Sequence, residues 1–352
     1  MYISIVIPVY NVSKELLDRC LDSVLSQITD DEIIIIDDGS CEDKVEEYQT
    51  ICKQDERIHY YRQDNSGPSV ARNNGVEKAN GEYVLFLDAD DYITDHCIDQ
   101  AKRIILEEHP DIVFGYVYKD LSDDGSIRYK ESDVTPQNVV VEGKQELGIL
   151  LNHILGYTDS KYKFISGYLS DGPWCRFFKK DIFVDAKFDT VPRWNEDTLW
   201  NIELLNRCQK AVICKSLWYI YAIRKGSAMQ GYRSNCYEEF MYITSKVYSV
   251  GHSSWKGEVD KGIAYRVWHD IFILSRGLIF NNKNADTFRN KYRMLKSAIK
   301  SDAYQKAISM TDFECEDRLG RKVMKQLLNG LMKTRLYLGA YIMIKTYVRK
   351  YS

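Results

Sequence analysis

The sequence predicts an α/β fold: a doubly wound, mainly parallel sheet followed by an α-helical C-terminal region. Short apolar segments alternate with amphipathic helical segments through the first 118 residues. Repeated strand–helix–strand units with short connections favour parallel strands joined by right-handed crossovers. After Gly231 the apolar residues recur at helical spacing instead. With 352 residues, 45% of them apolar, the chain is long enough for two domains.

The first five expected strands are short runs of β-branched and aromatic residues. They are Tyr2–Ile7, which Pro8 ends, then Ile33–Ile36, Ile58–Tyr61, Tyr83–Leu87 and Ile112–Tyr118. The helices between them begin at capping residues or show helical spacing of apolar residues. They follow Ser13, cover about 42–53, run from Ser69 to about Asn80, and cover 95–107.

Residues 119–195 form an irregular region, after which regular elements return. The expected features are a turn at 123–125, a possible strand at Val139–Val141, a helix near 144–155, a loop at 156–173, a helix near 197–208, and strands near 211–214 and 217–222. We therefore expect a first domain at 1–230, with halves 1–118 and 119–230, and a helical domain at 231–352. A helical stripe in 258–280 supports the second domain: Val259, Ile263, Val267, Ile271, Leu274 and Leu278.

Three acids follow the fourth strand within four positions: Asp88, Asp90 and Asp91. Clustered carboxylates repel one another unless a cation lies between them. Oxygen ligands suit Mg²⁺ or Mn²⁺, which usually join the protein to phosphate groups. The segment therefore indicates a metal–diphosphate site, and the alternative is an acidic turn that caps the next helix.

Other strand ends also carry polar residues: 8–11, 37–40 and 65–73. Parallel strands would bring these groups to one sheet edge. A carboxylate of Asp37 or Asp38 can accept the imide N–H of a uracil ring, and Gly67 lets a ligand approach a helix N-terminus, which favours phosphate. Arg72 can pair with a diphosphate. The alternatives are a capped turn for the acids and a solvated helix face for Arg72.

Several other site classes lack their sequence signals. The chain has no dinucleotide fingerprint, no phosphate loop and no nucleophile elbow. Its six histidines form no pair at zinc-binding spacing. A direct displacement that needs no enzyme nucleophile is consistent with these absences.

Four of these segments closely resemble family 2 glycosyltransferases of the GT-A fold, as found in bacterial surface-polysaccharide synthesis. They are Ile5–Asn11, Ile36–Ser40, Gly67–Asn73 and Phe86–Asp91. Three later segments are also similar to bacterial members: Gly172–Phe178, Trp194–Leu199 and Tyr219–Met229. The resemblance covers about residues 1–230.

The resemblance implies an inverting, hexosyltransferase-type transfer from a nucleotide-sugar, usually a UDP-sugar, with Mn²⁺ or Mg²⁺ as cofactor. Asp197 would be the general base and Glu196 its neighbour, although acids at a helix start also act as caps. Asp88 and Asp90 would bind the metal, with Asp91 a possible alternative; no His lies between 154 and 251, so the third ligand is open. The expected donor-binding residues are Pro8, Tyr10, Asn11, Asp38 (uracil), Gly67, Arg72 (diphosphate), Asp88 and Ala89.

Compartment is predicted from cysteines and hydropathy. The nine cysteines form no Cys-x-x-Cys pair, and we interpret them as reduced packing residues of a cytosolic protein. The sequence starts with a strand and shows no signal peptide before it. No segment approaches the roughly 20 apolar residues of a membrane span. We expect a cytoplasmic protein, peripheral on the inner membrane.

The C-terminal tail carries the basic charge. Residues 318–352 contain nine Lys or Arg and no acid, whereas the other 317 residues have 39 bases against 51 acids. A stripe of Leu319, Val323, Leu327, Leu331, Leu338 and Ile342 lies among these bases. The pattern is typical of an interfacial helix on anionic lipid; the alternative is a helical domain that packs this stripe on the first domain. Nucleic acid is not expected, because no binding motif appears.

The expected acceptor is a lipid-linked or growing polysaccharide. Two other functions remain open: a sugar-nucleotide pyrophosphorylase, which would want a Gly-rich basic N-terminal loop, and a non-catalytic nucleotide-sugar-binding scaffold. The sequence does not predict the sugar, the acceptor, the linkage or the oligomeric state.

Overall fold

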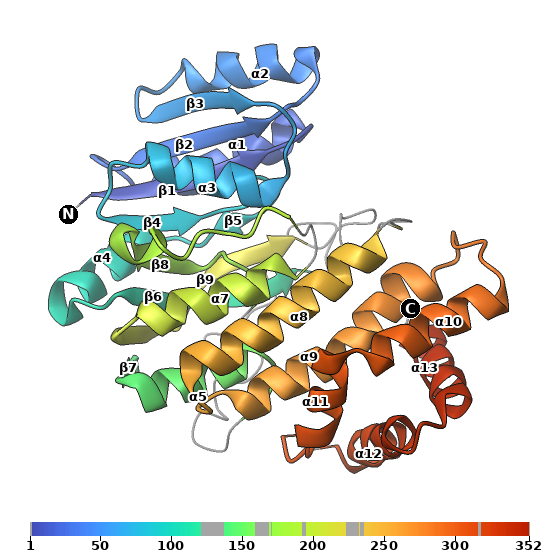
Figure 1. Cartoon of the computed structure of the whole chain (residues 1–352). Coiled ribbons are helices and arrows are strands. Elements are labelled where there is room, and N and C mark those ends of the chain that lie inside the picture. The colour runs from blue at the N-terminus through green and yellow to red at the C-terminus, as the bar shows by residue number, and fades with distance from the viewer. Residues whose placement is uncertain are drawn as a thin grey trace. The chain divides into compact units, whose positions relative to one another are not determined.

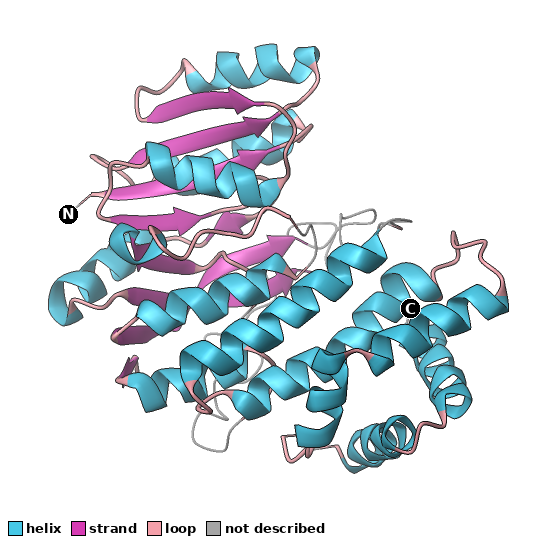
Figure 2. Cartoon of the chain, in the orientation of Figure 1, coloured by secondary structure: helices cyan, strands magenta, loops and turns pink. Residues whose placement is uncertain are grey.

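The computed structural model describes residues 2–120, 137–158, 169, 171–191, 195–222, 232, 236–315 and 318–351. The chain divides into two compact units. The first unit is Met1–Leu147 with Phe164–Arg224, and the helical unit is Gly148–Lys163 with Lys225–Ser352. Residues 148–163 thus group with the C-terminal helices, whereas the sequence placed them in the first domain. Figure 2 shows the described strands in the first unit and helices throughout the rest of the chain.

One sheet organises the first unit (Figure 1). In the described residues its order is β3-β2-β1-β4-β8-β6-β9-β5, and β7 pairs with the first half of β9. The strands are β1 (Ile3–Val9), β2 (Glu32–Asp38), β3 (Ile58–Gln63), β4 (Tyr83–Phe86), β5 (Tyr92–Ile93), β6 (Ile112–Asp120), β7 (Val139–Glu142), β8 (Arg176–Lys179) and β9 (Lys210–Ala222).

The sheet is mixed: its described pairs are parallel and antiparallel in equal number, although most strands point the same way. Strands β3, β2, β1 and β4 are mutually parallel. Strand β8 runs antiparallel to both β4 and β6, so β6 and its parallel partner β9 point the same way as β1. The predicted α/β fold class is confirmed, and the carboxyl ends of β1, β2 and β4 meet at one edge.

Several elements differ from expectation. β5 and β8 were not expected, and the two strands expected near 211–214 and 217–222 are one strand, β9, whose pairing with β6 shifts register around Tyr116. β1 continues through Pro8 to Val9. The Val6 carbonyl accepts the Leu87 N–H on the β4 side, and β4 ends there. Pro8 faces the same side beyond that end, so its missing N–H removes no ladder bond.

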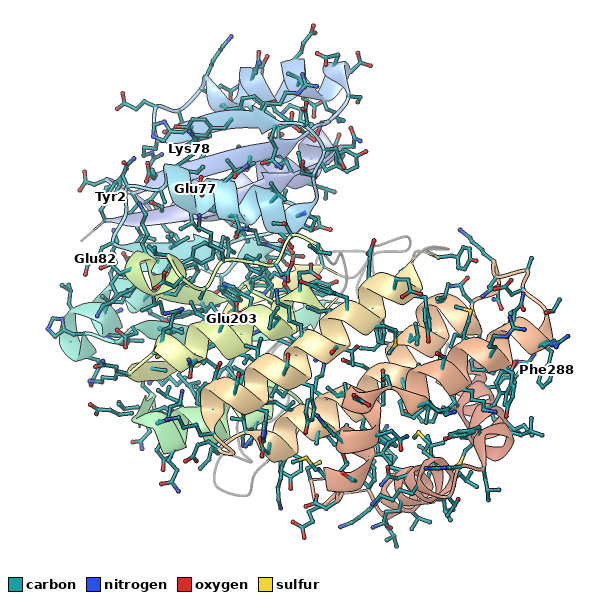
Figure 3. The ribbon with its side chains drawn as sticks, viewed as in Figure 1. Tyr2, Glu77, Lys78, Glu82, Glu203 and Phe288 are labelled. Atoms are coloured by element: carbon teal, nitrogen blue, oxygen red, sulfur yellow. The ribbon has the colours of Figure 1, made fainter. Side chains whose placement is uncertain are left out.

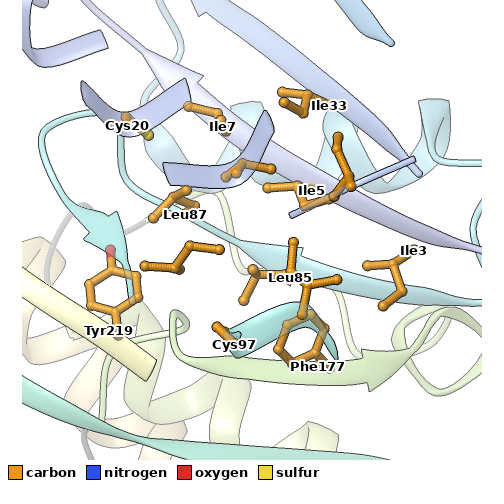
Figure 4. Packing of buried hydrophobic residues seen from close by; sticks show 14 of the residues in the cluster. Ile3, Ile5, Ile7, Cys20, Ile33, Leu85, Leu87, Cys97, Phe177 and Tyr219 are labelled. Atoms are coloured by element: carbon orange, nitrogen blue, oxygen red, sulfur yellow. The ribbon is translucent and has the colours of Figure 1, made fainter. Parts of the chain in front are cut away.

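Helices cover both faces of the sheet. The helices are α1 (Lys14–Leu25), α2 (Glu42–Cys52), α3 (Pro68–Lys78), α4 (Cys97–Glu108), α6 (Lys180–Phe183), α7 (Glu196–Arg207), and α5 (Lys144–Ile154), which crosses the division between units. On one face of the sheet, Ile5 and Ile7 of β1 pack in a buried cluster with Leu17 and Cys20 of α1. Figure 4 shows Ile5, Leu85 and Phe177 in that cluster. On the opposite face, Val6 lies against α3.

The helical unit continues after residue 235. Its elements are α8 (Cys236–Trp255), α9 (Asp260–Leu274) with a π-helical turn η4 (Ser275–Ile279), α10 (Phe288–Lys300), α11 (Asp302–Met310), α12 (Leu319–Lys333) and α13 (Tyr337–Tyr351). All six residues of the stripe predicted in 258–280 are buried. Among the helices described here, none combines the length and apolar character needed to cross a bilayer.

Candidate active site

The polar residues after β1 and β2 hold these two strand ends together. The Asn11 N–H donates to Ser40 Oγ at 2.9 Å, and the Asn11 side-chain oxygen accepts the Cys41 N–H at 2.9 Å. Asn11 has a left-handed φ of 51°, a conformation that asparagine tolerates better than most residues. Asn11 is therefore engaged in shaping this edge of the sheet.

Asp38 organises the loop that leads into α3. Its Oδ1 accepts Gln63 Nε2 at 2.8 Å and the Ser66 N–H at 2.7 Å, while Oδ2 accepts the Gly67 N–H at 2.8 Å. A carboxylate offers about four lone pairs, so one position on Oδ2 remains for another donor. Gly67 has φ 92°, which a residue with a side chain rarely adopts.

A cavity opens next to Asp38. Its volume is about 780 Å³, and it is lined by Gly39, Arg62, Gln63, Asp64 and Asn65 at the carboxyl ends of β2 and β3. Gln63, which binds Asp38, is one of its walls. A cavity of this size falls within the range of small-molecule sites.

Arg72 lies at the centre of the site. This buried residue of α3 donates from Nη2 to Asp88 Oδ1 at 2.9 Å, and its Nη1 lies 3.9 Å from Asp197 Oδ1. Burial alone would lower the pKa of Arg72, but the carboxylates of Asp88 and Asp197 outweigh it and raise that pKa. One charged guanidinium therefore brings together two acids that are 109 positions apart in the sequence.

Asp197 retains hydrogen-bonding capacity. In the described part of the chain, its buried Oδ1 has no hydrogen-bond partner, and neither has Arg72 Nε. Burial raises the pKa of Asp197 well above its usual range; Glu196 raises it further, and Arg72 opposes this. Polar atoms without a hydrogen-bond partner at such a position indicate a site that a polar ligand completes.

Hydrogen bonds from Asn201 and Arg176 fix the first turn of α7. Asn201, one turn after Asp197, donates from Nδ2 to the Asp197 and Asp171 carbonyls, both at 2.7 Å. Buried Arg176 donates to Asn201 Oδ1 and to the Gly172 carbonyl. Burial lowers the pKa of Arg176 to about 10, so it remains a cation at neutral pH. This network joins β8 and the loop before it to the helix that carries Asp197.

Asp91 has a structural role in this site. Its Oδ2 accepts the Tyr219 hydroxyl at 2.7 Å, and its Oδ1 accepts the Ala222 N–H at 2.9 Å. The same hydroxyl accepts the Asp88 N–H at 3.2 Å. Burial raises the pKa of Asp91 to about 8, and the charges of Asp88 and Asp90 add to this. The use of Asp91 as an alternative metal ligand stays a prediction; each of its oxygens already accepts one hydrogen bond within the protein.

The acids partly fit a divalent cation. Among the described residues, no three Asp, Glu, His or Cys side chains gather into a metal site. Asp88 and Asp90 remain, and Mg²⁺ is commonly held by one or two carboxylates plus substrate phosphates. This donor set fits a cation that arrives with a diphosphate better than one that resides permanently in the protein. The predicted metal role of Asp88 and Asp90 stays a prediction.

The remaining predicted residues differ in exposure. Tyr10 is exposed and Pro8 is partly buried, both at the β1 end. Ala89 is buried, with its methyl group in the core cluster, so any donor contact there would involve its backbone. Glu196 is buried in the first turn of α7. Trp194 and residues 224–229 lie outside the described residues.

Sequence reasoning missed the supporting residues Tyr219, Asn201 and Arg176. Asn201 follows Asp197 by four positions, and this spacing on a helix could have signalled a shared face. Tyr219 was part of a noted motif, but nothing in the sequence connects it with Asp91. Figure 3 labels Glu77 and Lys78 on α3 and Glu203 on α7, the two helices that supply Arg72 and Asp197.

Comparisons with known proteins identify the family of the chain. The sequence model described as Glycosyl transferase family 2 matches residues 4–183, about half of the chain. The chain belongs to glycosyl transferase family 2. This confirms the predicted family, and the matched region contains every predicted site residue except Glu196 and Asp197.

Three similar glycosyltransferases come from bacteria. The chain is 31% identical to glycosyltransferase GlyG of Streptococcus pneumoniae, over 65% of this chain and 73% of GlyG. It is 29% identical to GlyA of the same organism, over 64% of this chain but 31% of GlyA, so it spans about a third of that relative. It is 26% identical to the uncharacterized glycosyltransferase EpsJ of Bacillus subtilis, over 95% of this chain and 93% of EpsJ.

Solved structures share the GT-A fold. Staphylococcus aureus TarS 1-349 in complex with UDP-GlcNAc has a TM-score of 0.69 at 17% identity, with 99% of this chain and 92% of that chain covered. TarS 1-349 in complex with UDP has a TM-score of 0.65 at 16% identity. At these identities the likeness establishes the fold and leaves ligands to be argued from the site.

Proposed function

We propose that the protein is an inverting, metal-dependent glycosyltransferase that moves a sugar from a nucleotide-sugar, a UDP-sugar in the first instance, to an acceptor hydroxyl. The observation that carries the proposal is the position of Arg72 between Asp88 and Asp197. The guanidinium that could pair with a diphosphate (Arg72), an acid of the proposed metal motif (Asp88) and the candidate catalytic base (Asp197) therefore lie close together. Family membership and the UDP complexes of the TarS fold relative support the donor class.

The donor would lie along this edge. The cavity beside Asp38 would take the nucleoside, and the remaining position on Asp38 Oδ2 would accept a hydrogen bond from the nucleobase. The diphosphate would approach Arg72 and the N-terminus of α3, where backbone N–H groups and positive charge favour anions. Asp88 and Asp90 would hold Mn²⁺ or Mg²⁺, which when bound stabilises the charge of the leaving diphosphate.

The reaction is a single displacement. The acceptor oxygen forms a bond to the anomeric carbon while the bond from that carbon to the diphosphate oxygen breaks, and the bonding electrons leave with the nucleoside diphosphate. Asp197 takes the hydroxyl proton as the new bond forms, a contribution of about 10²–10⁴-fold. The Asp197 side chain is 31% exposed, so an acceptor hydroxyl can reach its carboxylate, and Arg176 and Asn201 fix the helix turn from which it acts.

We also propose the class of acceptor and the cellular location. The bacterial relatives and the sequence pattern favour a lipid-linked or growing glycan as acceptor, at the cytoplasmic face of a membrane. The hexose nature of the sugar stays a prediction.

Replacing Asp197 tests the proposal. We expect Asp197→Asn to lower transfer by about 10²–10⁴-fold, because the proton acceptor is lost, while UDP affinity changes little. Released UDP is measured with a panel of UDP-sugars and acceptors, and UDP binding by calorimetry. Near-normal turnover of the variant would remove Asp197 as the base. Release of pyrophosphate instead of UDP would favour a pyrophosphorylase, and binding without any turnover would favour a scaffold.

A further inference from the structure

Helix α12 presents apolar side chains on both of its faces. The inward face buries Leu328 and Met332 in the helical unit. The outward face carries Leu319, Val323 and Leu327, whose exposed fractions are 75%, 44% and 60%. With about 3.6 residues per turn, these three form one continuous stripe. Large apolar residues in a row on a surface indicate an interaction site.

Helix α13 and the turn before it also expose apolar side chains. Tyr341, Ile344 and Val348 are buried inward, whereas Leu338 and Ile342 are 52% and 58% exposed. Leu336 in the turn is also exposed. Between the two helices lies an apolar groove of about 570 Å³, lined by Val323, Gln326, Leu327, Gly330, Leu331, Thr334 and Met343. We call the exposed apolar residues of α12, the turn and α13, together with this groove, the α12–α13 face.

Basic side chains border this face. On α12, helical geometry places Lys322 and Lys333 along one edge of the outward stripe. On α13, Lys345 and Arg349 lie beside Leu338 and Ile342 in the same way. Residues 318–352 contain no acid, so the positive charge of this segment is not balanced within the segment. Long basic side chains can extend from an apolar surface toward an anionic layer.

We propose that the α12–α13 face binds the surface of a bilayer that contains anionic lipids, with the exposed leucines inserted between headgroups and the bordering bases on the lipid phosphates. Apolar insertion and electrostatic attraction act together in such interfacial helices. A second copy of this chain fits less well, because it would place two acid-free, basic faces against each other. This inference extends the predicted tail binding, because both α12 and α13 contribute exposed apolar and basic side chains.

Vesicle flotation of the full chain tests this directly and requires no donor, acceptor or turnover. Vesicles of phosphatidylcholine alone are compared with vesicles rich in phosphatidylglycerol. We expect the wild type to float with the anionic vesicles. An apolar variant, Val323→Ser with Leu327→Ser and Ile342→Ser, and a charge variant, Lys322→Gln with Lys333→Gln and Arg349→Gln, should each bind at least about tenfold more weakly. All six side chains lie at or near the surface, so folding should be kept, and circular dichroism checks this.

Changes of the same kind elsewhere serve as controls. Leu106→Ser with Val184→Ser removes exposed apolar side chains outside the face, and Lys53→Gln with Lys283→Gln and Lys300→Gln removes exposed bases. Both controls should float like the wild type. Equal flotation of the face variants, or no flotation of the wild type, overturns the proposal. Light scattering tests the rival occupant, a second copy of this chain. If the wild type is a dimer that does not bind vesicles, and the apolar variant is a monomer, the face is assigned to a second copy.

Discussion

At the scale of single residues, Arg72 shows how the free site stays folded with its charges buried. The guanidinium is 7% exposed and would be costly to desolvate alone, but Asp88 and Asp197 compensate it. Its Nε still lacks a hydrogen-bond partner among the described groups. A bound diphosphate could satisfy that atom and compete for the charge now shared by two carboxylates.

The ionisation of Asp197 should appear in the pH dependence of transfer. Burial raises the pKa of Asp197, Glu196 raises it further and Arg72 opposes this. A general base works only when deprotonated, so kcat/KM should fall as pH drops through that raised pKa. We expect this acid limb well above the ordinary aspartate value of about 3.9, and its loss in Asp197→Asn. The same limb in both proteins would assign it to another group.

Removing the Tyr219 hydroxyl should impair donor binding. Tyr219→Phe removes the hydroxyl that donates to Asp91 Oδ2 and accepts the Asp88 N–H. The 88–91 turn therefore loses both of these hydrogen bonds. We expect a loss of about 1–3 kcal/mol in the free energy of unfolding and a higher KM for the donor. Denaturant unfolding and steady-state kinetics measure the two effects.

Tyr83→Phe is the matched control for this prediction. Tyr83 is another buried tyrosine, and its hydroxyl donates to the Pro110 carbonyl at 2.5 Å, with no bond to the 88–91 turn. It should lower stability and leave the donor KM unchanged. Equal donor KM values for the two variants would show that Tyr219 acts through stability alone.

At the scale of elements, the close approach of α3 to β1 positions Arg72. An ideal Cβ on Gly75 would lie 2.2 Å from Val6 Cγ1, so α3 can pack this near the sheet only with glycine there. The glycine is therefore retained inside a helix despite its unfavourable helix propensity.

Gly75→Ala should destabilise the protein. The added methyl group must push α3 away from Val6, and overpacking of this kind typically costs about 1–3 kcal/mol. Gly330→Ala in α12 is the control, because no described atom beyond its chain neighbours and its own helix backbone lies within 4 Å of the position that the new methyl group would take. Alanine also favours the helix by up to about 1 kcal/mol. Denaturant titrations should thus show changes of opposite sign, and a neutral Gly75→Ala would contradict the packing argument.

At the scale of the whole molecule, the site is expected to assemble around two ligands that bind together. The described residues offer Asp88 and Asp90 for a cation but no cluster of three ligands. We expect Mn²⁺ alone to change the Tm little, UDP alone to raise it slightly, and the two together to raise it more than the sum. A ligand that binds only the native state stabilises it in proportion to occupancy.

Asp90→Asn tests the additional increase in Tm that is expected when Mn²⁺ and UDP are present together. The variant should keep the small effect of UDP and lose the additional effect of Mn²⁺. A large Tm increase with Mn²⁺ alone would point to a resident metal site instead.

The sequence by itself determined the alternation of strands and helices in the first 118 residues apart from the short strand β5, the helical character of the C-terminal region and the positions of the acids within 88–91 and at 196–197. These depend on local patterns: strand runs, helical spacing and short motifs that keep their meaning without their neighbours. Tertiary structure alone decided that β8 and β5 complete the sheet, that Asp91 binds Tyr219, and that Arg72 joins Asp88 to Asp197. Those pairings connect positions far apart in the chain, and their partners are set by packing and burial, which no local pattern records.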